Sequence, residues 1–354
     1  MSRRYAILAP GHFAHDAKTA HGVIAYSSDA TVAVIDPACA GRRVRDVVAY
    51  LASDAPIVGS VREALTFAPT ALLIGTAPKG GALPAEWRAE ILAAIAAGLE
   101  IVSGLHDMLG DDAEFAAAAA ARGVRIWDVR KPPQTPIFSG EAYRVAAPTV
   151  LFVGNDCAVG KMTVALELAH AAERAGKRAA FVPTGQTGIM IAGWGTAIDR
   201  TIADFAPGAT EALVLQAARE EPDVIFVEGQ GAINHPAYAP VTLALMYGAA
   251  PDALVLVCDP TRAHIESYAT PTLGYRELIR THEALLATVK PARVVGIALN
   301  TRKLDEAGAR HAIAQAREQT HLPADDVVRF GADALYAAIA PELRKGSPCV
   351  ASSL

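Results

Sequence analysis

The sequence predicts an α/β protein of two domains, each a parallel sheet covered by helices, with a phosphate-binding loop at the start of the second domain. Three observations indicate this fold class. Short apolar segments rich in β-branched residues alternate with Ala-rich helical segments, as in parallel α/β sheets. A glycine turn that contains a lysine, VGNDCAVGKMT, joins one of these segments to a helix. The 354 residues are enough for two domains, and a proline-rich segment separates two alternating series.

The first domain is expected at residues 1–135. In chain order, its expected strands are Tyr5–Ala9, Thr31–Ile35, Thr70–Ile74 and Val124–Trp127, and its expected helices are Arg43–Leu51, Ala85–Ala97 and Glu114–Ala121. No G-x-G-x-x-G follows the first strand, which argues against a nicotinamide cofactor. Its other polar candidates are interpreted as structural; they are His12, His15, His21, Asp36, Lys79, His106 and Asp107.

A connector and then the second domain follow. The segment from Arg130 to Pro148 carries four prolines, so we expect a linker at 136–148 and a second domain at 149–354. In chain order, the expected strands of this domain are Thr149–Val153, Arg178–Val182, Asp223–Val227, Ala253–Cys258 and Arg293–Ala298.

The loop after Thr149–Val153 is expected to bind phosphate, because a glycine turn and a helix N-terminus gather backbone N–H groups around one point. Lys161, expected on an exposed turn, adds a cation, and Thr163 adds a hydroxyl. The loop departs from the usual pattern, since five residues separate its glycines and Met162 replaces the hydroxyl residue after the lysine. The expected cofactor-binding residues are Gly154, Asn155, Asp156, Cys157, Ala158, Val159, Gly160, Lys161, Met162 and Thr163.

Other candidate side chains follow the later strands, whose carboxyl ends face the ligand cleft in open α/β sheets. Glu228, in EGQG, is expected to bind Mg²⁺, to act as a general base, or merely to cap the next element. His235 is a weaker candidate, because a lone histidine is more often structural. Residues 183–200 read as a long glycine-containing loop, which is often functional. Its candidates are Thr184, Gln186 and Thr187 for ligand hydrogen bonds, and Asp199 and Arg200 for an amine and a carboxylate.

The composition indicates which kinds of partner and which cellular compartment to expect. The net charge is −5 and no long basic run occurs, which argues against nucleic acid. No uninterrupted apolar stretch of membrane-spanning length is found, and no signal-peptide core. The cysteines Cys39, Cys157, Cys258 and Cys349 show no paired spacing and read as reduced thiols. We therefore expect a cytoplasmic enzyme with a small-molecule substrate, and a homo-oligomer.

These motifs resemble those of two known protein families. The second domain resembles the dethiobiotin synthetase branch of the P-loop proteins, which has the same five-residue gap, an acid-Gly-x-Gly turn matched at Glu228, and an Asn near the purine matched at Asn300. The whole chain, with GTAPKGG, SGLHD, DVRKPP, GNDCAVGKMT and PTGQTG, is similar to a two-domain P-loop family of formerly unknown function that includes D-glutamate N-acetyltransferases. The resemblance implies a Rossmann-like parallel-sheet domain followed by a P-loop NTPase-like α/β domain.

The resemblance also implies an acetyltransferase that uses acetyl-CoA. We expect no metal ligands. Glu228 is then the first choice for the base, His235 the second and Asp199 the third, while Arg200 and Lys18 are candidates for the substrate carboxylates. The alternative is an ATP-dependent ligase or kinase acting on a small carboxylate, with Lys161 on the γ-phosphate and Thr163 and Glu228 on Mg²⁺. Met162 weakens that metal site. A nucleotide-sensing switch is the non-enzymatic reading.

Overall fold

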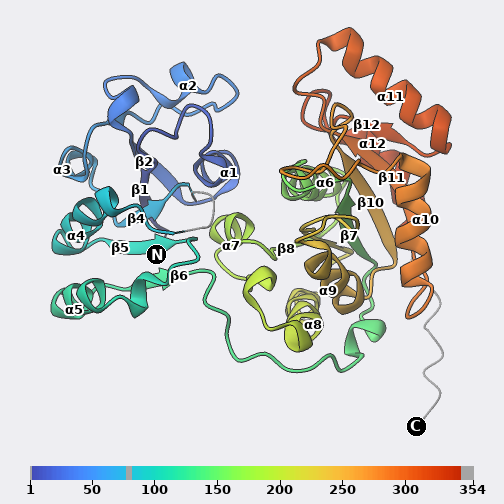
Figure 1. Cartoon of the computed structure of the whole chain (residues 1–354), viewed down its shortest axis with the longest axis horizontal. Coiled ribbons are helices and arrows are strands. Elements are labelled where there is room, and N and C mark those ends of the chain that lie inside the picture. The colour runs from blue at the N-terminus through green and yellow to red at the C-terminus, as the bar shows by residue number, and fades with distance from the viewer. Residues whose placement is uncertain (1, 77–81, 344–354) are drawn as a thin grey trace. The chain divides into compact units, whose positions relative to one another are not determined.

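The computed structural model describes residues 2–76 and 82–343. Contacts between Cα atoms divide the chain into two compact units, one of Met1–Pro132 with Gln186–Ala197 and the other of Pro133–Gly185 with Ile198–Leu354. Figure 1 shows a sheet with flanking helices in each unit. No helix among the described residues is both long enough and apolar enough to span a bilayer.

The first unit is a six-stranded sheet in the order β3-β2-β1-β4-β5-β6. The strands are β1 (Arg4–Leu8), β2 (Ala30–Ile35), β3 (Ile57–Val58), β4 (Ala71–Ile74), β5 (Glu100–Ser103) and β6 (Ile126–Asp128). Every neighbouring pair is parallel. This is the order of the Rossmann fold, so the predicted fold class of the first domain is confirmed.

Helices cover both faces of this sheet (Figure 1). They are α1 (Lys18–Tyr26), α2 (Val44–Val47), α3 (Val61–Ala64), α4 (Arg88–Ala96) and α5 (Ala113–Arg122). One core joins α3, α4 and α5 to β1 through buried residues such as Leu8, Ile91 and Phe115. The helix predicted at Arg43–Leu51 is wrong in length, because only Val44–Val47 is helical.

The first unit also contains a helix that we did not predict, α7 (Gln186–Ala192). The sequence indicated a loop over 183–200 in the second domain, but these residues form a helix that packs on α1. Thr187 Oγ1 lies 3.0 Å from Thr19 Oγ1 of α1. A Cβ on Gly104, after β5, would lie 3.1 Å from Met190 Cε. The glycines of this segment therefore did not prevent a helix, because its apolar side chains are buried.

The second unit is another parallel six-stranded sheet, in the order β12-β11-β10-β7-β9-β8. Its strands are β7 (Thr149–Gly154), β8 (Ala179–Val182), β9 (Val224–Val227), β10 (Ala253–Cys258), β11 (Arg293–Leu299) and β12 (Ala324–Asp325). Its helices are α6 (Lys161–Arg174), α8 (Ala206–Ala218), α9 (Ala239–Ala249), α10 (Tyr275–Leu286), α11 (Glu306–Thr320) and α12 (Asp333–Ile339).

β7 is the centre of this sheet, between β9 and β10. The chain runs from β7 to one side of the sheet and later returns to build the other side. The loop after β7 therefore lies at the topological switch point, where open α/β sheets bind their ligands. All six residues of β7 are buried, and Phe152 packs in a core with α6 and α12. This packing fixes the position of the loop that follows.

The predicted linker packs within the second unit. Glu211 of α8 is buried, and its carboxylate accepts hydrogen bonds from Ser139 N at 2.5 Å and Ala142 N at 3.0 Å. A Cβ on Gly208 would lie 2.0 Å from the carbonyl oxygen of Pro136. The segment 136–148 is thus anchored to α8, while the predicted domain limits themselves stay a prediction.

Candidate functional site

The phosphate loop, residues 154–163, connects β7 to α6. Ala158 and Gly160 both have left-handed backbone angles, with φ of 55° and 106°. Gly160 suits this conformation because it has no Cβ. A Cβ on Gly154 would lie 2.7 Å from the carbonyl oxygen of Val257, so glycine lets the loop start close against β10. The loop therefore turns sharply and points its backbone toward the start of α6.

The backbone N–H groups of the phosphate loop are available to a ligand. Within the described part of the chain, none of the N–H groups from Ala158 to Thr163 donates a hydrogen bond. They lie at the N-terminal end of a 14-residue helix. Several free N–H donors together with the positive end of a helix dipole form an anion site. This arrangement supports the predicted phosphate-binding role of the loop.

Lys161 differs from expectation in one respect. We predicted an exposed turn, but Lys161 is the first residue of α6 and only 6% exposed. Its Nζ donates hydrogen bonds to the carbonyl oxygens of Asp156, at 2.7 Å, and Gly231, at 2.8 Å. Burial lowers the pKa of Lys161 to about 8. The ammonium group is thus held inside the site by the loop itself and by the turn after β9.

Glu228 follows β9 beside the phosphate loop and is also 6% exposed. Its Oε2 accepts hydrogen bonds from the backbone N–H groups of Thr184, at 2.9 Å, and Gly185, at 3.0 Å. Burial raises the pKa of Glu228 to about 7. No hydrogen bond to Oε1 is found among the described residues. One oxygen is anchored and the other is able to accept a proton, as a general base requires.

Thr184 and Gln230 hold this carboxylate in place. Thr184 Oγ1 donates to the carbonyl oxygen of Glu228 at 2.9 Å. Gln230 Nε2 donates to the carbonyl oxygen of Thr184 at 2.7 Å. Thr184, predicted to bind substrate, therefore uses its hydroxyl to fix the strand end that carries Glu228. Gln230 was not singled out from the sequence, although it belongs to the EGQG motif.

The other predicted substrate-binding residues fall in different places. Asp199 and Arg200 are exposed in the second unit, and the charge of Asp199 contributes to the raised pKa of Glu228. Gln186, Thr187 and Lys18 belong to the first unit. Lys18 is the exposed first residue of α1. The structure therefore groups Asp199 and Arg200, but not the other three, with the unit that carries Glu228.

Asp156 is the fully buried acid of the phosphate loop. Its carboxylate pairs with Arg262 and accepts a hydrogen bond from Glu266 N at 2.8 Å. Asn155 exchanges hydrogen bonds with the backbone of Asp259 at 3.2 Å. These contacts tie the phosphate loop to the segment after β10. The sequence placed that segment at the cleft but gave Arg262 no role, because the motif alone does not show its partner.

The structure also shows where the other predicted residues of the phosphate loop and its surroundings lie. Asn300, predicted near a purine, donates from Nδ2 to the carbonyl oxygen of Val159 at 3.1 Å. Met162 and Thr163 are partly exposed on the first turn of α6, and Cys157 is partly exposed in the loop. A carboxylate oxygen of Asp156, Sγ of Cys157 and a ring nitrogen of His235 lie within 4.8 Å of one another. His235 therefore approaches the phosphate loop.

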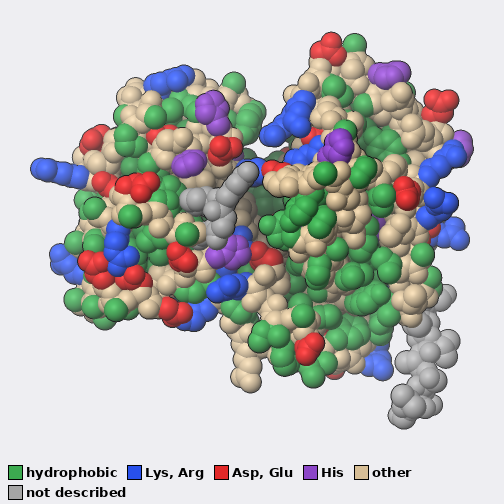
Figure 2. All heavy atoms as spheres, in the orientation of Figure 1, with side chains coloured by type: hydrophobic (Ala, Val, Ile, Leu, Met, Phe, Trp, Pro, Cys, Tyr) green, Lys and Arg blue, Asp and Glu red, His purple; other side chains and the backbone are tan. Residues whose placement is uncertain are grey.

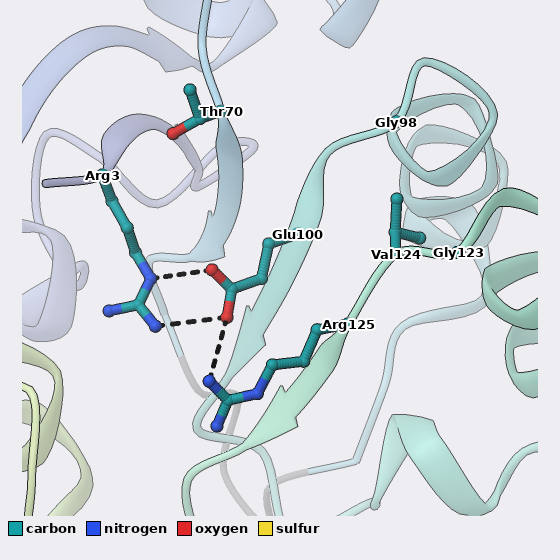
Figure 3. Close-up of a pocket in the computed structure, with 7 residues that line it drawn as sticks. All are labelled: Arg3, Thr70, Gly98, Glu100, Gly123, Val124 and Arg125. Atoms are coloured by element: carbon teal, nitrogen blue, oxygen red, sulfur yellow. Dashed lines mark hydrogen bonds and ion pairs between the residues drawn. The ribbon is translucent and has the colours of Figure 1, made fainter. Parts of the chain in front are cut away.

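The first unit has a depression of about 430 Å³ at the amino ends of its strands, which lie opposite to their carboxyl ends. Figure 3 shows its ion pairs. Arg3 Nε lies 2.8 Å from Glu100 Oε2, and Arg125 Nη1 lies 3.6 Å from Glu100 Oε1. Because these charges satisfy one another, the depression reads as a structural feature. Charges of both signs are interspersed over this unit on the face in Figure 2.

The structural interpretation of Asp36 in the first unit agrees with its contacts. Its carboxylate accepts hydrogen bonds from the backbone N–H groups of Gly11, Phe13 and Ala38. Lys79, in the GTAPKGG motif, lies outside the described residues.

Comparison with known proteins identifies the family. Residues 136–336 match a domain of unknown function described as the DUF1611 P-loop domain, and residues 37–132 match the DUF1611 Rossmann-like domain. The chain is 40% identical to a DUF1611 family protein of known crystal structure from Anabaena variabilis, with a TM-score of 0.91 over 96% of this chain and 100% of that chain.

Two curated relatives have a name that states an activity. A D-glutamate N-acetyltransferase from Tritonibacter scottomollicae is 38% identical over 285 residues, which cover 79% of this chain and 84% of that protein. A protein of the same name from a Pseudoalteromonas species is 35% identical over 282 residues, covering 78% of this chain and 83% of that protein. The family models and the structural match agree across both domains, and the chain belongs to the DUF1611 family.

Proposed function

We propose that the protein is an N-acyltransferase that moves an acetyl group from acetyl-CoA to the amine of an acidic amino acid, with D-glutamate as the substrate. Relatives at 35–38% identity that carry the name D-glutamate N-acetyltransferase support an acetyltransferase. The observation that carries the proposal is the position of Glu228, buried beside a phosphate loop with one carboxylate oxygen unbonded.

The phosphate loop fits the phosphate groups of coenzyme A. The N-terminal end of α6 presents N–H groups that have no acceptor within the described ranges. Lys161 adds a positive charge at the same point. Coenzyme A would supply the acetyl group as a thioester, and the loop would hold its phosphates without needing to cleave them. Met162, in the place of a metal-binding hydroxyl residue, is compatible with that role.

Glu228 is proposed as the general base. In acyl transfer the substrate amine forms a bond to the acetyl carbon, the bond from that carbon to sulfur breaks, and the amine loses a proton. The carboxylate of Glu228 takes this proton, and its pKa of about 7 suits a base that works at neutral pH. The hydrogen bonds from Thr184 and Gly185 keep Oε2 fixed, so that Oε1 receives the proton.

Arg200 is proposed to bind a carboxylate of the substrate. It is exposed and makes no ion pair with another described residue. It directly follows Asp199, whose charge acts on Glu228. A guanidinium matches a carboxylate with two parallel hydrogen bonds. The second unit therefore offers a cation for an acidic amino acid near the proposed base.

The experiment is a product assay without ATP. Purified protein with acetyl-CoA and D-glutamate is expected to release free coenzyme A and N-acetyl-D-glutamate in equal amounts, with L-glutamate and D-alanine as poorer acceptors. Arg200→Ala should raise the KM for D-glutamate and leave the KM for acetyl-CoA unchanged. Arg219→Ala, another exposed arginine of the second unit, is the control. Product that forms only with ATP and Mg²⁺, together with ADP, would establish the ligase or kinase alternative instead.

A further inference from the structure

The geometry points to a binding role for His235: its Nε2–H donates a hydrogen bond to an anionic oxygen of the phosphorylated ligand held by the phosphate loop. This inference rests on the proposed function only for the identity of that ligand as coenzyme A. The role differs from that of a base, for which His235 was a candidate in the sequence.

The hydrogen bonds of His235 determine which ring nitrogen carries the proton. His235 Nδ1 accepts hydrogen bonds from the backbone N–H groups of Ala237, at 3.1 Å, and Tyr238, at 3.2 Å. An N–H group cannot donate to a nitrogen that already carries a proton. In the neutral ring one nitrogen is a donor and the other an acceptor. Nδ1 is therefore the acceptor, and the proton is on Nε2.

Within the described residues, the Nε2–H group of His235 has no hydrogen-bond acceptor. Nε2 lies 4.0 Å from Asp156 Oδ1, which is too long for a hydrogen bond. No other partner of Nε2 occurs within the described residues. The side chain of His235 is only 1% exposed. At this exposure Nε2 has little access to water, and a ligand oxygen that accepts its hydrogen bond supplies a partner that the described chain does not.

The ring is also held rigidly toward the phosphate loop. Tyr238 packs on it with ring centroids 4.5 Å apart, and Tyr268 meets its edge at 5.3 Å. The charged groups facing it are Asp156, Glu266 and Lys161, and burial is the main cause of its lowered pKa. Because Asp156 is paired with Arg262, its charge is already compensated where an anion would approach. The ring is therefore neutral and presents Nε2–H to the ligand.

A metal ion at Asp156, Cys157 and His235 does not fit this geometry. Nε2 would have to lose its proton to bind a metal, and Nδ1 would then carry a proton that faces two N–H donors. Arg262, paired with Asp156 Oδ2, would also place a positive charge beside the metal ion. The same argument excludes Nε2 of the neutral ring as a proton acceptor, so His235 is a binding residue here and Glu228 remains the base.

The test combines ring chemistry and affinity. The ¹⁵N spectrum of ligand-free protein should show a protonated Nε2 and an unprotonated Nδ1 for His235. A protonated Nδ1, or loss of the Nε2 proton on adding one equivalent of Zn²⁺, would overturn the inference. His235→Asn keeps an acceptor for the two backbone N–H groups but lacks Nε2, so the turn should remain folded.

Calorimetry then compares wild type, His235→Asn and the exposed control His311→Asn, with coenzyme A and with inorganic pyrophosphate as probes. Loss of one hydrogen bond to a charged group should weaken binding by about 10- to 100-fold. Equal affinity of wild type and His235→Asn for a probe that binds would overturn the inference. If pyrophosphate binds in a His235-dependent way but coenzyme A does not bind wild type, the proposed function fails while this inference stands.

Discussion

Glu228 and Lys161 are two buried ionisable residues whose pKa values are shifted in opposite directions. Burial raises the pKa of Glu228 to about 7 and lowers that of Lys161 to about 8. Because burial disfavours the charged form of either group, both groups titrate close to neutral pH. Such pairs are typical of sites that move protons. These two pKa shifts are the main electrostatic reason to propose that proton transfer takes place at the site of Glu228 and Lys161.

The shifted pKa of Glu228 predicts a pH-dependent stability. Its pKa is raised from the usual 4.5 to about 7 in the folded protein. The folded state therefore holds a proton that the unfolded state releases, so wild type loses stability as pH rises between these values. Glu228→Gln should gain roughly 3 kcal/mol in unfolding free energy relative to wild type from pH 4 to pH 8. Urea denaturation at both pH values measures this.

The control for this prediction is Glu318→Gln, an exposed residue on α11. The difference in unfolding free energy between Glu318→Gln and wild type should change little from pH 4 to pH 8. If the stability difference between Glu228→Gln and wild type does not change with pH, Glu228 is not buried as the structure shows.

At the scale of elements, the site depends on how closely β7 and the turn after β9 approach each other. A Cβ on Gly229 would lie 1.5 Å from the carbonyl oxygen of Phe152. No residue with a side chain fits at this distance without moving the backbone. The glycine directly after Glu228 therefore allows the carboxylate to lie beside the phosphate loop.

Gly229→Ala is accordingly expected to be among the most damaging single changes, with a loss above about 4 kcal/mol or no soluble protein. Gly274→Ala is the matched control, since a Cβ there meets no atom within 4 Å. The control should lose less than about 1 kcal/mol. Thermal unfolding of both variants decides the point. Similar midpoints would mean that β7 and the turn are not packed so closely.

The sequence predicted the long strands well, because runs of buried apolar residues are visible without tertiary information. It missed β3, β5 and β12, of which β3 and β12 have two residues each and show no periodicity. It also missed α1, α3 and α7; the glycines of α7 indicated a loop, and its stability comes from packing on α1. The phosphate loop and Glu228 are local motifs and were therefore predictable. The burial of Lys161 and the ring proton of His235 were not, because they depend on residues distant in sequence.

At the scale of the whole molecule, the chain forms two parallel sheets, and the segment 186–197 belongs to the first unit although it follows β8 of the second. All three tryptophans, Trp87, Trp127 and Trp194, belong to the first unit. Tryptophan fluorescence therefore reports on the unfolding of this unit, while circular dichroism reports on both.

This assignment predicts the effect of Met190→Ala in α7. Met190 is 1% exposed, and its truncation should destabilise the unit by about 2–5 kcal/mol. The fluorescence transition should move to lower denaturant concentration. Ile202→Ala, at a side chain that is 71% exposed in the second unit, should change stability by less than about 0.5 kcal/mol. An unchanged fluorescence transition in Met190→Ala would place α7 outside the first unit.

Glu228 is proposed to take the amine proton during acetyl transfer. The most direct test of this claim is the rate of N-acetyl-D-glutamate formation by wild type and Glu228→Gln across pH, at saturating acetyl-CoA and without ATP. The wild-type rate should rise through about pH 7, as the carboxylate ionises. The variant should be about 10²- to 10⁴-fold slower at neutral pH, with an unchanged KM for acetyl-CoA. A variant rate within about threefold of wild type at neutral pH, far from the effect of a positioned base, would contradict the claim.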